Sequence, residues 1–433
     1  MRKILVAGAG HGGLAAAYNL AKAGHAVTVL EQKAREEAGY DWLDCISLRT
    51  LQTVGVSPLP PEALRPYRPM AYRGPSKDVT LTPDPPKGAV HLKYVDRKVL
   101  LRHLIREAEA AGAAVKFGCT VTGPLLSGSR VTGVRYRENG TEKEETADLV
   151  IDAAGIRSPL RRSLPDALGI QREIAEEDTL FVYRACYEKT EPRMTEPPCN
   201  MYFYHCRRKG LDWMITDEDN ADILVGTFGP VTRQEVCDAV ADMRRDFPFV
   251  GQRIVRGGSM EAIPLRPPLP RLIADGYALV GDSASMVACL SGSGMDYAMS
   301  AGKMLADTVI HAGEQPLTAA VLWPYQHTFF KNCGLNTLND NMLKHFLMDA
   351  GAAGTDALFR KKILTEREMS GAGRHYTKKE LAAKAFALLS TPVLWRPIIK
   401  LARQNRINRK IKQTFPDAYD PAALAAWERI YKV

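Results

Sequence analysis

Three glycines near the start of the chain, Gly8, Gly10 and Gly13, have the spacing that binds a diphosphate. They follow an apolar run over residues 4–7, which predicts a buried parallel strand. Gly8 permits the tight turn, Gly10 lets backbone amides approach phosphates, and Gly13 lets the next helix pack closely on the strand. Glu31 ends the following apolar run, about 20 residues after the first glycine, where a carboxylate accepts hydrogen bonds from ribose hydroxyls. This order of strand, helix, strand and acid predicts a dinucleotide site.

A second glycine-rich segment lies much further along the chain, after a short apolar strand. Gly281 and Asp282 end this strand, and a carboxylate at the C-terminal end of a strand can reach a chain of sugar-like hydroxyls. Gly292 and Gly294 then open an alanine-rich helix, whose N-terminus would attract an anion. The alternative is a glycine-rich turn that caps an ordinary helix. Two segments of the nucleotide-binding type in this order favour a binding pocket.

With these two segments the sequence resembles the FAD-dependent fold shared by group A flavin monooxygenases, flavin-dependent halogenases and the geranylgeranyl reductase family. The resemblance covers about residues 1–310. It implies an α/β protein with a Rossmann-type, glutathione-reductase-like FAD-binding domain, an inserted antiparallel β substrate domain and a helical C-terminal region. It also implies FAD as the cofactor and NAD(P)H as the electron donor.

The resemblance places each FAD contact on a residue of a matching motif. The first glycine motif and Glu31 would hold the ADP part, Asp282 the ribityl chain, and the later glycines the flavin ring. Arg97, at the start of a helix, would contact the diphosphate or the flavin, with a simple salt bridge as the alternative. Val121, in a strand expected over residues 115–121, would meet the adenine through its backbone. The implied cofactor-binding residues are Gly8, Gly10, Gly13, Glu31, Arg97, Val121, Gly281, Asp282, Gly292, Gly294 and Met295.

Two departures from the hydroxylase pattern favour a reductase. Residues 148–162 resemble the hydroxylase segment that is linked to both FAD and NAD(P)H, but Ala154 takes the place of its aspartate and Asp152 lies two residues earlier. The hydroxylases also place His and Pro after the Gly-Asp pair, where this chain has Ser285 and Cys289. The helix after Gly292 instead resembles that of the geranylgeranyl reductases. NAD(P)H binding therefore stays open.

The candidates for chemistry beside the flavin each have a structural alternative. Asp41 and Asp44, in a loop expected over the flavin, are candidate proton donors, or they cap and solvate that loop. Cys289 is a candidate redox thiol or an inert buried cysteine. Trp213, which remains from the reductase and halogenase signatures, is a candidate substrate contact or a core aromatic. Cys45 matches a cysteine of archaeal reductases and is a second candidate for the substrate pocket.

The elements that must position these residues divide the chain into three parts. Residues 1–162 and 271–312 would form a discontinuous FAD-binding domain. Residues 163–270 alternate β-like runs with polar turns, which predicts the antiparallel substrate domain. Residues 313–433 predict a helical region, with glycine turns at 351–354 and 371–373.

Composition is that of a globular protein: 433 residues, of which 45% are hydrophobic and 25% charged. The chain begins directly with a strand, and no window approaches the ~20 apolar residues that span a bilayer, so we expect a cytoplasmic protein. Its eight cysteines are scattered without a CxxC pair, which predicts reduced thiols and no metal site.

The net charge of +9 is concentrated near the C-terminus, where residues 384–412 include no acidic residue. Apolar residues recur at helical spacing there, which predicts a basic amphipathic helix. They are Leu394, Trp395, Ile398, Ile399, Ala402, Ile407 and Ile411. Such a helix could lie on an anionic membrane through residues 392–412, or pack its apolar stripe on the body of the protein. We expect no nucleic acid partner, because no nucleic-acid-binding motif accompanies the charge.

Three functions fit this sequence. The first is an FAD-dependent reductase that transfers a hydride from reduced flavin to a C=C bond of an apolar substrate such as an isoprenoid, a lipid or a steroid. The second is a flavin monooxygenase that hydroxylates its substrate. The third is a membrane-peripheral flavoprotein that passes electrons from a donor protein to quinone. We expect an apolar small-molecule substrate, and the sequence names neither it nor the electron donor.

Overall fold

The apolar run at the start of the chain becomes a central strand of a largely parallel sheet. The computed structural model describes residues 1–86, 88–370 and 376–431. Strand β1 (Lys3–Ala7) pairs in parallel with β2 (Ala26–Glu31) on one side and β12 (Leu149–Asp152) on the other. The six strands follow the order β18-β19-β12-β1-β2-β8, with β8 at Ala114–Phe117, β18 at Ile273–Ala274 and β19 at Tyr277–Leu279. We call it the parallel sheet; β18 alone pairs antiparallel, with β19.

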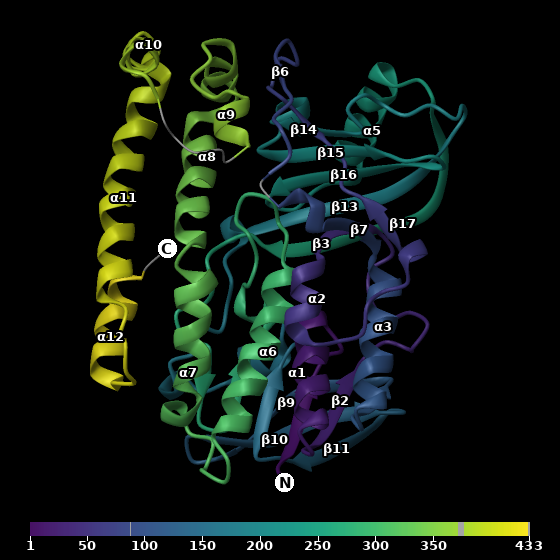
Figure 1. Cartoon of the computed structure of the whole chain (residues 1–433), viewed down its shortest axis with the longest axis vertical. Coiled ribbons are helices and arrows are strands. Elements are labelled where there is room, and N and C mark those ends of the chain that lie inside the picture. The colour runs from purple at the N-terminus through teal and green to yellow at the C-terminus, as the bar shows by residue number, and fades with distance from the viewer. Residues whose placement is uncertain (87, 371–375, 432–433) are drawn as a thin grey trace.

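The helices that follow the two glycine segments lie against each other above the parallel sheet (Figure 1). They are α1 (His11–Lys22) and α6 (Met295–His311). A Cβ added to Gly12 would lie 2.8 Å from the Ala298 oxygen, and one added to Gly302 would lie 2.2 Å from the Gly12 oxygen. Only glycine permits backbones to approach so closely. Helix α3 (Arg97–Ala110) packs on the other side of α1.

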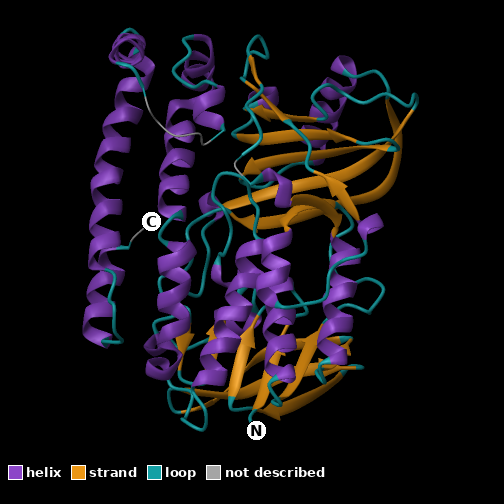
Figure 2. Cartoon of the chain, in the orientation of Figure 1, coloured by secondary structure: helices purple, strands orange, loops and turns teal. Residues whose placement is uncertain are grey.

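A larger sheet lies across the other end of these helices (Figure 2). Its order is β17-β13-β16-β15-β14-β5-β6, and we call it the cover sheet. Five strands come from the predicted substrate domain, and two come from residues 70–81, which the sequence assigned to the first part. Helix α5 (Arg233–Asp246) packs its apolar side on the outer face. The strands are β5 (Met70–Arg73), β6 (Thr80–Leu81), β13 (Thr179–Lys189), β14 (Cys199–Phe203), β15 (Gly210–Thr216), β16 (Asn220–Phe228) and β17 (Val250–Pro264).

Two three-stranded sheets complete the β structure. One consists of β9 (Cys119–Ser127), β10 (Arg130–Glu138) and β11 (Thr141–Thr146). The other consists of β3 (Leu43–Ser47), β4 (Leu64–Pro66) and β7 (Leu92–Asp96). The expected single strand over residues 115–121 is wrong, because Gly118 has a φ of +69° and turns the chain from β8 into β9. Short helices α2 (Leu48–Val54) and α4 (Pro159–Ser163) lie in the connections.

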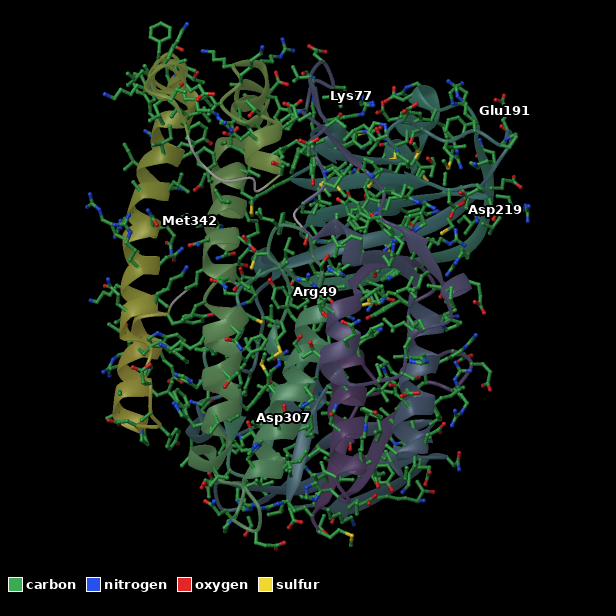
Figure 3. All side chains as sticks on the ribbon, in the orientation of Figure 1. Arg49, Lys77, Glu191, Asp219, Asp307 and Met342 are labelled. Carbon is green, nitrogen blue, oxygen red and sulfur yellow. The ribbon has the colours of Figure 1, made fainter. Side chains whose placement is uncertain are left out.

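The C-terminal part is helical, as expected. Helices α8 and α11 run side by side, and their side chains fill the space between them (Figure 3). The expected turn at residues 351–354 is wrong, because α8 continues through this segment with only Gly351 outside helical geometry. The turn expected at 371–373 lies outside the described residues. The helices are α7 (Ala319–Phe329), α8 (Thr337–Arg360), α9 (Glu366–Met369), α10 (Lys378–Leu389), α11 (Trp395–Thr414) and α12 (Pro421–Ile430).

The basic C-terminal segment forms two helices, and part of its apolar stripe is used for packing. Leu394 and Ile411 are fully buried, and the Asn408 side-chain amide donates to the Leu338 carbonyl of α8 at 2.9 Å. Trp395, Ile399 and Ala402 of the stripe are exposed, so the stripe packs on the body only in part. Within the described residues no single helix is long and apolar enough to cross a membrane; α10 together with residues 392–414, bent by 92°, passes that test by length and composition only.

Trp427 of α12 anchors the C-terminal end of the chain. Its ring lies 5.0 Å from that of Phe415 and 5.4 Å from that of Phe330, and its Nε1 donates to the Ile411 carbonyl at 2.9 Å. We expect Trp427→Ala to lower the free energy of unfolding by about 3–5 kcal/mol, because it leaves a cavity among these rings. Thermal or urea unfolding measures this loss. Phe386→Ala, at an exposed position, should change the free energy of unfolding by less than about 0.5 kcal/mol. Equal losses in the two variants would contradict the role of Trp427 as a buried anchor.

Candidate functional site

Both glycine segments line one cavity of about 940 Å³ between the parallel sheet and the cover sheet. One wall consists of the loops after β1, β2, β12 and β19, where strands of a parallel sheet end. The opposite wall is the inner face of the cover sheet. In a doubly wound sheet the crevice at the carboxyl ends of the strands is where ligands bind. The cavity therefore lies where the sequence predicts chemistry.

The first end of the cavity is formed by the turn between β1 and α1. Gly8 has a φ of +94°, and its missing Cβ would lie 2.6 Å from the Ala153 oxygen, so the turn requires glycine. Gly10 is the N-cap of α1 and supplies no side chain to the first-turn amides, which remain available to an anion. The Glu31 carboxylate accepts from the amides of Ala9 and Lys33, both at 2.9 Å. These bonds fix its orientation and leave lone pairs for further donors.

Gly13 differs from the other two glycines because it does not line the cavity. A Cβ there would lie 2.8 Å from the Ala153 Cβ and 2.9 Å from the Val6 Cγ1. Its role is the close packing of helix on strand, so its placement among the residues that hold a diphosphate is corrected.

The second end of the cavity is formed by the segment that connects β19 to α6. Gly281, Asp282, Gly292, Gly294 and Met295 all line it. Gly281 and Gly292 have φ values of +70° and +71°, and no side chain caps the N-terminus of α6. Burial raises the pKa of Asp282, and the nearby Arg97 opposes this shift. The free amides at the N-terminus of α6 could donate hydrogen bonds to a chain of hydroxyl groups or to the electronegative edge of an aromatic ring. Val121 of β9 also lines the cavity, so it faces the site despite the wrong strand assignment.

Arg97 and His11 face the cavity between its two ends. The Arg97 Nη1 donates to the Asp44 carboxylate at 3.1 Å, so the salt bridge expected as an alternative does form. Its buried Nε has no hydrogen-bond partner among the described groups, and neither has the His11 Nε2. Burial, with Arg97 nearby, lowers the pKa of His11 to about 3, so the imidazole is neutral. Unpaired buried polar atoms are costly, which indicates that a ligand supplies their partners.

Asp152 and its neighbours have separate roles. The Asp152 carboxylate is buried and accepts from the Tyr277 hydroxyl at 2.6 Å and from the Ala154 amide at 3.1 Å. It also accepts from Ser158, the N-cap of α4. Ala153 and Ala154 line the cavity, whereas Asp152 does not. The carboxylate therefore shapes the loop and does not reach a ligand.

A buried arginine connects the cover sheet to the loop above the cavity. Arg184 of β13 is only 2% exposed, and its guanidinium donates to Asp222 and Asp44, each at 2.9 Å. Its guanidinium carbon lies 5.1 Å from the ring centre of Trp42 and 5.3 Å from that of Trp213. We call these five residues the Arg184 cluster. It fixes the position of two large aromatic side chains on the cavity wall.

The structure argues against Asp41 and Asp44 as proton donors. Asp41 does not line the cavity and forms an ion pair with Arg256 at 2.8 Å. Asp44 does line it. Burial would raise the pKa of Asp44, but Arg184 and Arg97 outweigh that effect and hold it below its ordinary value. An ionised carboxylate held by two arginines is a positioning group and not an acid.

The remaining wall of the cavity is apolar. Cys45, Trp213, Tyr94, Cys199 and Ile215 pack together there, and both substrate-contact candidates are among them. The sulfur of Cys45 is a thiol, because burial raises its pKa to about 12. This wall suits a hydrocarbon chain.

Cys289 is not at the cavity. It is fully buried and does not line the cavity wall, and burial raises the pKa of its thiol to about 12. Its candidacy as a redox thiol is corrected, because a protonated thiol without access to the cavity cannot exchange with a bound group.

Several polar residues of the cavity were not predicted from the sequence, among them Arg184, Glu261 and Asp296. Arg184 lines the cavity on the same face of β13 as Leu180 and Val182. The signal that could have identified it is a charged residue in a series of alternate positions that are otherwise apolar. Glu261 of β17 and Asp296 of α6 also line the cavity, and burial raises the pKa of both. The sequence around Glu261 and Asp296 has no pattern that distinguishes these two acids from acidic residues on the surface.

Two sequence-family models match the chain. One, described as "FAD dependent oxidoreductase", matches residues 50–308, and the other, "NAD(P)-binding Rossmann-like domain", matches residues 6–39. The chain belongs to the FAD-dependent oxidoreductases. This membership confirms the expected fold class and FAD as the cofactor.

Relatives of this oxidoreductase include named reductases. Digeranylgeranylglycerophospholipid reductase 1 of Methanopyrus kandleri is 29% identical over 326 residues, which cover 73% of this chain and 82% of that protein. Digeranylgeranylglycerophospholipid reductase of Sulfolobus acidocaldarius is 21% identical over 441 residues, covering 98% and 95%. The crystal structure of a geranylgeranyl bacteriochlorophyll reductase-like protein from Thermoplasma acidophilum shares the fold, with a TM-score of 0.73, 18% identity and coverage of 93% and 99%.

Proposed function

We propose that FAD occupies the cavity with its ADP part at the Gly8–Gly10 turn and its flavin ring at the N-terminus of α6. Glu31 accepts the ribose hydroxyls, Asp282 binds the ribityl chain, and Arg97 uses its unpaired Nε on the cofactor. Two uncapped helix N-termini and two buried polar atoms without a partner, the Arg97 Nε and the His11 Nε2, support this placement. In this division residues 1–162 and 271–312 bind FAD, and residues 163–270 with β5 and β6 cover it.

The reaction that the cavity fits best is the reduction of a C=C bond in an apolar isoprenoid or lipid. The observation that carries this proposal is the apolar wall beside the end of the cavity that we propose for the flavin ring. This wall consists of Cys45, Tyr94, Cys199, Trp213 and Ile215. A long hydrocarbon gains binding energy there by leaving water. The names of the relatives, which are reductases of geranylgeranyl lipids, support this substrate class.

Reduction of an alkene adds one hydride and one proton across the double bond. Reduced FAD supplies the hydride when it is bound. The apolar wall holds the alkene and excludes water, and the Arg184 cluster keeps Trp42 and Trp213 in place. The proton comes from a group with a raised pKa, and Glu261 and Asp296 meet that condition whereas Asp44 does not. NAD(P)H or a donor protein reduces the flavin.

Anaerobic mixing tests this function directly. The enzyme with reduced FAD is mixed with digeranylgeranylglycerol phospholipid, geranylgeranyl diphosphate, a steroid enone or a simple enoate, and flavin absorbance is followed. We expect the prenyl lipids to reoxidise the flavin and to appear with fewer double bonds. No reoxidation by any of these alkenes would contradict the proposal. Oxygen from labelled O₂ in the product would show a monooxygenase instead.

A pair of variants links the reaction to the apolar wall. Ile215→Trp fills the space in front of this wall, which is where the substrate would lie. The variant should keep its flavin and should reoxidise it with prenyl lipid about tenfold more slowly. Ile254→Trp, at an exposed position of β17, is the matched control and should react like the parent enzyme.

A further inference from the structure

One corner of the molecule exposes several large apolar side chains. They belong to α10, to the turn that follows it and to the start of α11, and we call them the apolar corner. Phe386 is 73% exposed, Ile399 70% and Leu389 69%, whereas side chains of this kind are ordinarily buried. The members of the apolar corner are Leu381, Phe386, Leu389, Val393, Trp395 and Ile399.

The corner is a fixed shape. Helices α10 and α11 meet at 92°, at one end of the long axis of the molecule (Figure 1). The Trp395 Nε1 lies 3.3 Å from the Leu388 carbonyl and 3.2 Å from the Leu389 carbonyl, so this side chain caps α10 while half of its surface stays exposed. On the other side Leu394 is buried against Ala350 and Leu358 of α8. Side chains project outward from α10 at this end (Figure 3).

The surroundings of the corner are positively charged. Lys378, Lys379, Arg396 and Arg403 are exposed, and none of them forms an ion pair with another described residue. The one acidic residue of α10 and α11 is Glu380, whose carboxylate accepts from Thr377 and pairs with Arg367. Exposed apolar groups among unpaired cations are the chemistry that an anionic lipid surface binds.

We propose that the apolar corner docks the protein on an anionic bilayer. Phe386, Leu389 and Trp395 enter the interface between headgroups and acyl chains, and the basic side chains around them pair with lipid phosphates. The corner shares Trp395 and Ile399 with the stripe over residues 392–412 that the sequence indicates, and it extends from there onto α10. Leu394 and Ile411 of that stripe are buried instead. A partner protein fits less well, because the exposed charges around the corner are almost all basic, whereas a protein interface ordinarily presents both hydrogen-bond donors and acceptors.

Vesicle sedimentation tests this docking. The full-length protein with its flavin is mixed with vesicles of phosphatidylcholine alone or with about one-third phosphatidylserine. We expect binding to the anionic vesicles that weakens with added salt. The variant with Phe386→Ser and Leu389→Ser should bind at least about tenfold more weakly, while the variant with Ile254→Ser and Met260→Ser, exposed on β17, should bind like the parent.

Two charge-reversal variants provide a second test, which examines the basic side chains around the corner. Arg396→Glu with Arg403→Glu should lose binding to anionic vesicles by about tenfold, whereas Arg102→Glu with Arg106→Glu, exposed on α3, should not. The proposal is overturned if the parent binds neither vesicle, if both corner variants bind like the parent, or if the corner instead mediates self-association seen by light scattering. Circular dichroism confirms folding. Because the readout needs no turnover, its failure is distinct from failure of the proposed reductase activity.

Discussion

The variant Gly10→Val is expected to lose FAD binding and yet remain folded. Gly10 has an extended backbone, with φ −69° and ψ 162°, that any residue adopts. A Cβ there would approach no described atom closer than the Ala153 oxygen at 3.4 Å. Its side chain would, however, fill the space in front of the α1 amides, where the proposed diphosphate lies. We expect the dissociation constant for FAD to rise by at least about 100-fold, measured by titration of flavin fluorescence.

The matched control is Gly13→Ala, which should give the opposite result. The added methyl group would lie 2.8 Å from the Ala153 Cβ, behind the cavity wall. We expect the free energy of unfolding to fall by about 1–3 kcal/mol, and the folded fraction to bind FAD normally. If Gly10→Val binds FAD like the parent protein, the proposed position of the diphosphate is wrong.

The variant Arg184→Met is expected to be the most destabilised of the cavity variants. It removes the guanidinium shared by Asp222 and Asp44 and leaves both carboxylates without their main partner. Asp222 is almost fully buried, so its charge cannot recover hydration from water. Breaking a buried pair in this way costs about 3–5 kcal/mol, which chemical denaturation followed by circular dichroism will measure.

A surface ion pair serves as the control for this substitution. Arg162 and Glu173 pair at 3.0 Å with both side chains at least half exposed. Arg162→Met should therefore change stability by less than about 1 kcal/mol. If both variants lose a similar amount of unfolding free energy, the Arg184 ion pairs contribute no more to stability than a surface ion pair does.

The parts of the fold that local sequence determines were predictable. The turn at Gly8 and the N-cap at Gly10 depend on neighbours a few residues away, so the motif located one end of the cavity. By contrast, β5 pairs in parallel with β14, more than a hundred residues later, and its short segment has no alternation that would indicate a place in the cover sheet. Residues far apart in sequence decide that pairing.

The chemistry of the site depended even more on long-range contacts. Asp44 has the residue type of an acid catalyst, but Arg184, from another sheet, determines its ionisation. Cys289 follows the Gly-Asp pair closely in sequence, yet the chain turns it into the interior. The exposure of Phe386 was equally unpredictable, because only the packing of α11 on α8 shows which apolar groups remain without a cover.

The backbone contact between Gly12 and Gly302 has a consequence for cofactor selection. These glycines bring the backbones of α1 and α6 into direct contact, which sets the separation between the N-termini of the two helices. The cavity is therefore preorganised for a ligand of one length, and a mononucleotide could contact only one of the two helix ends at a time. A ligand selected by its length in this way requires no specific contact to the nucleotide base.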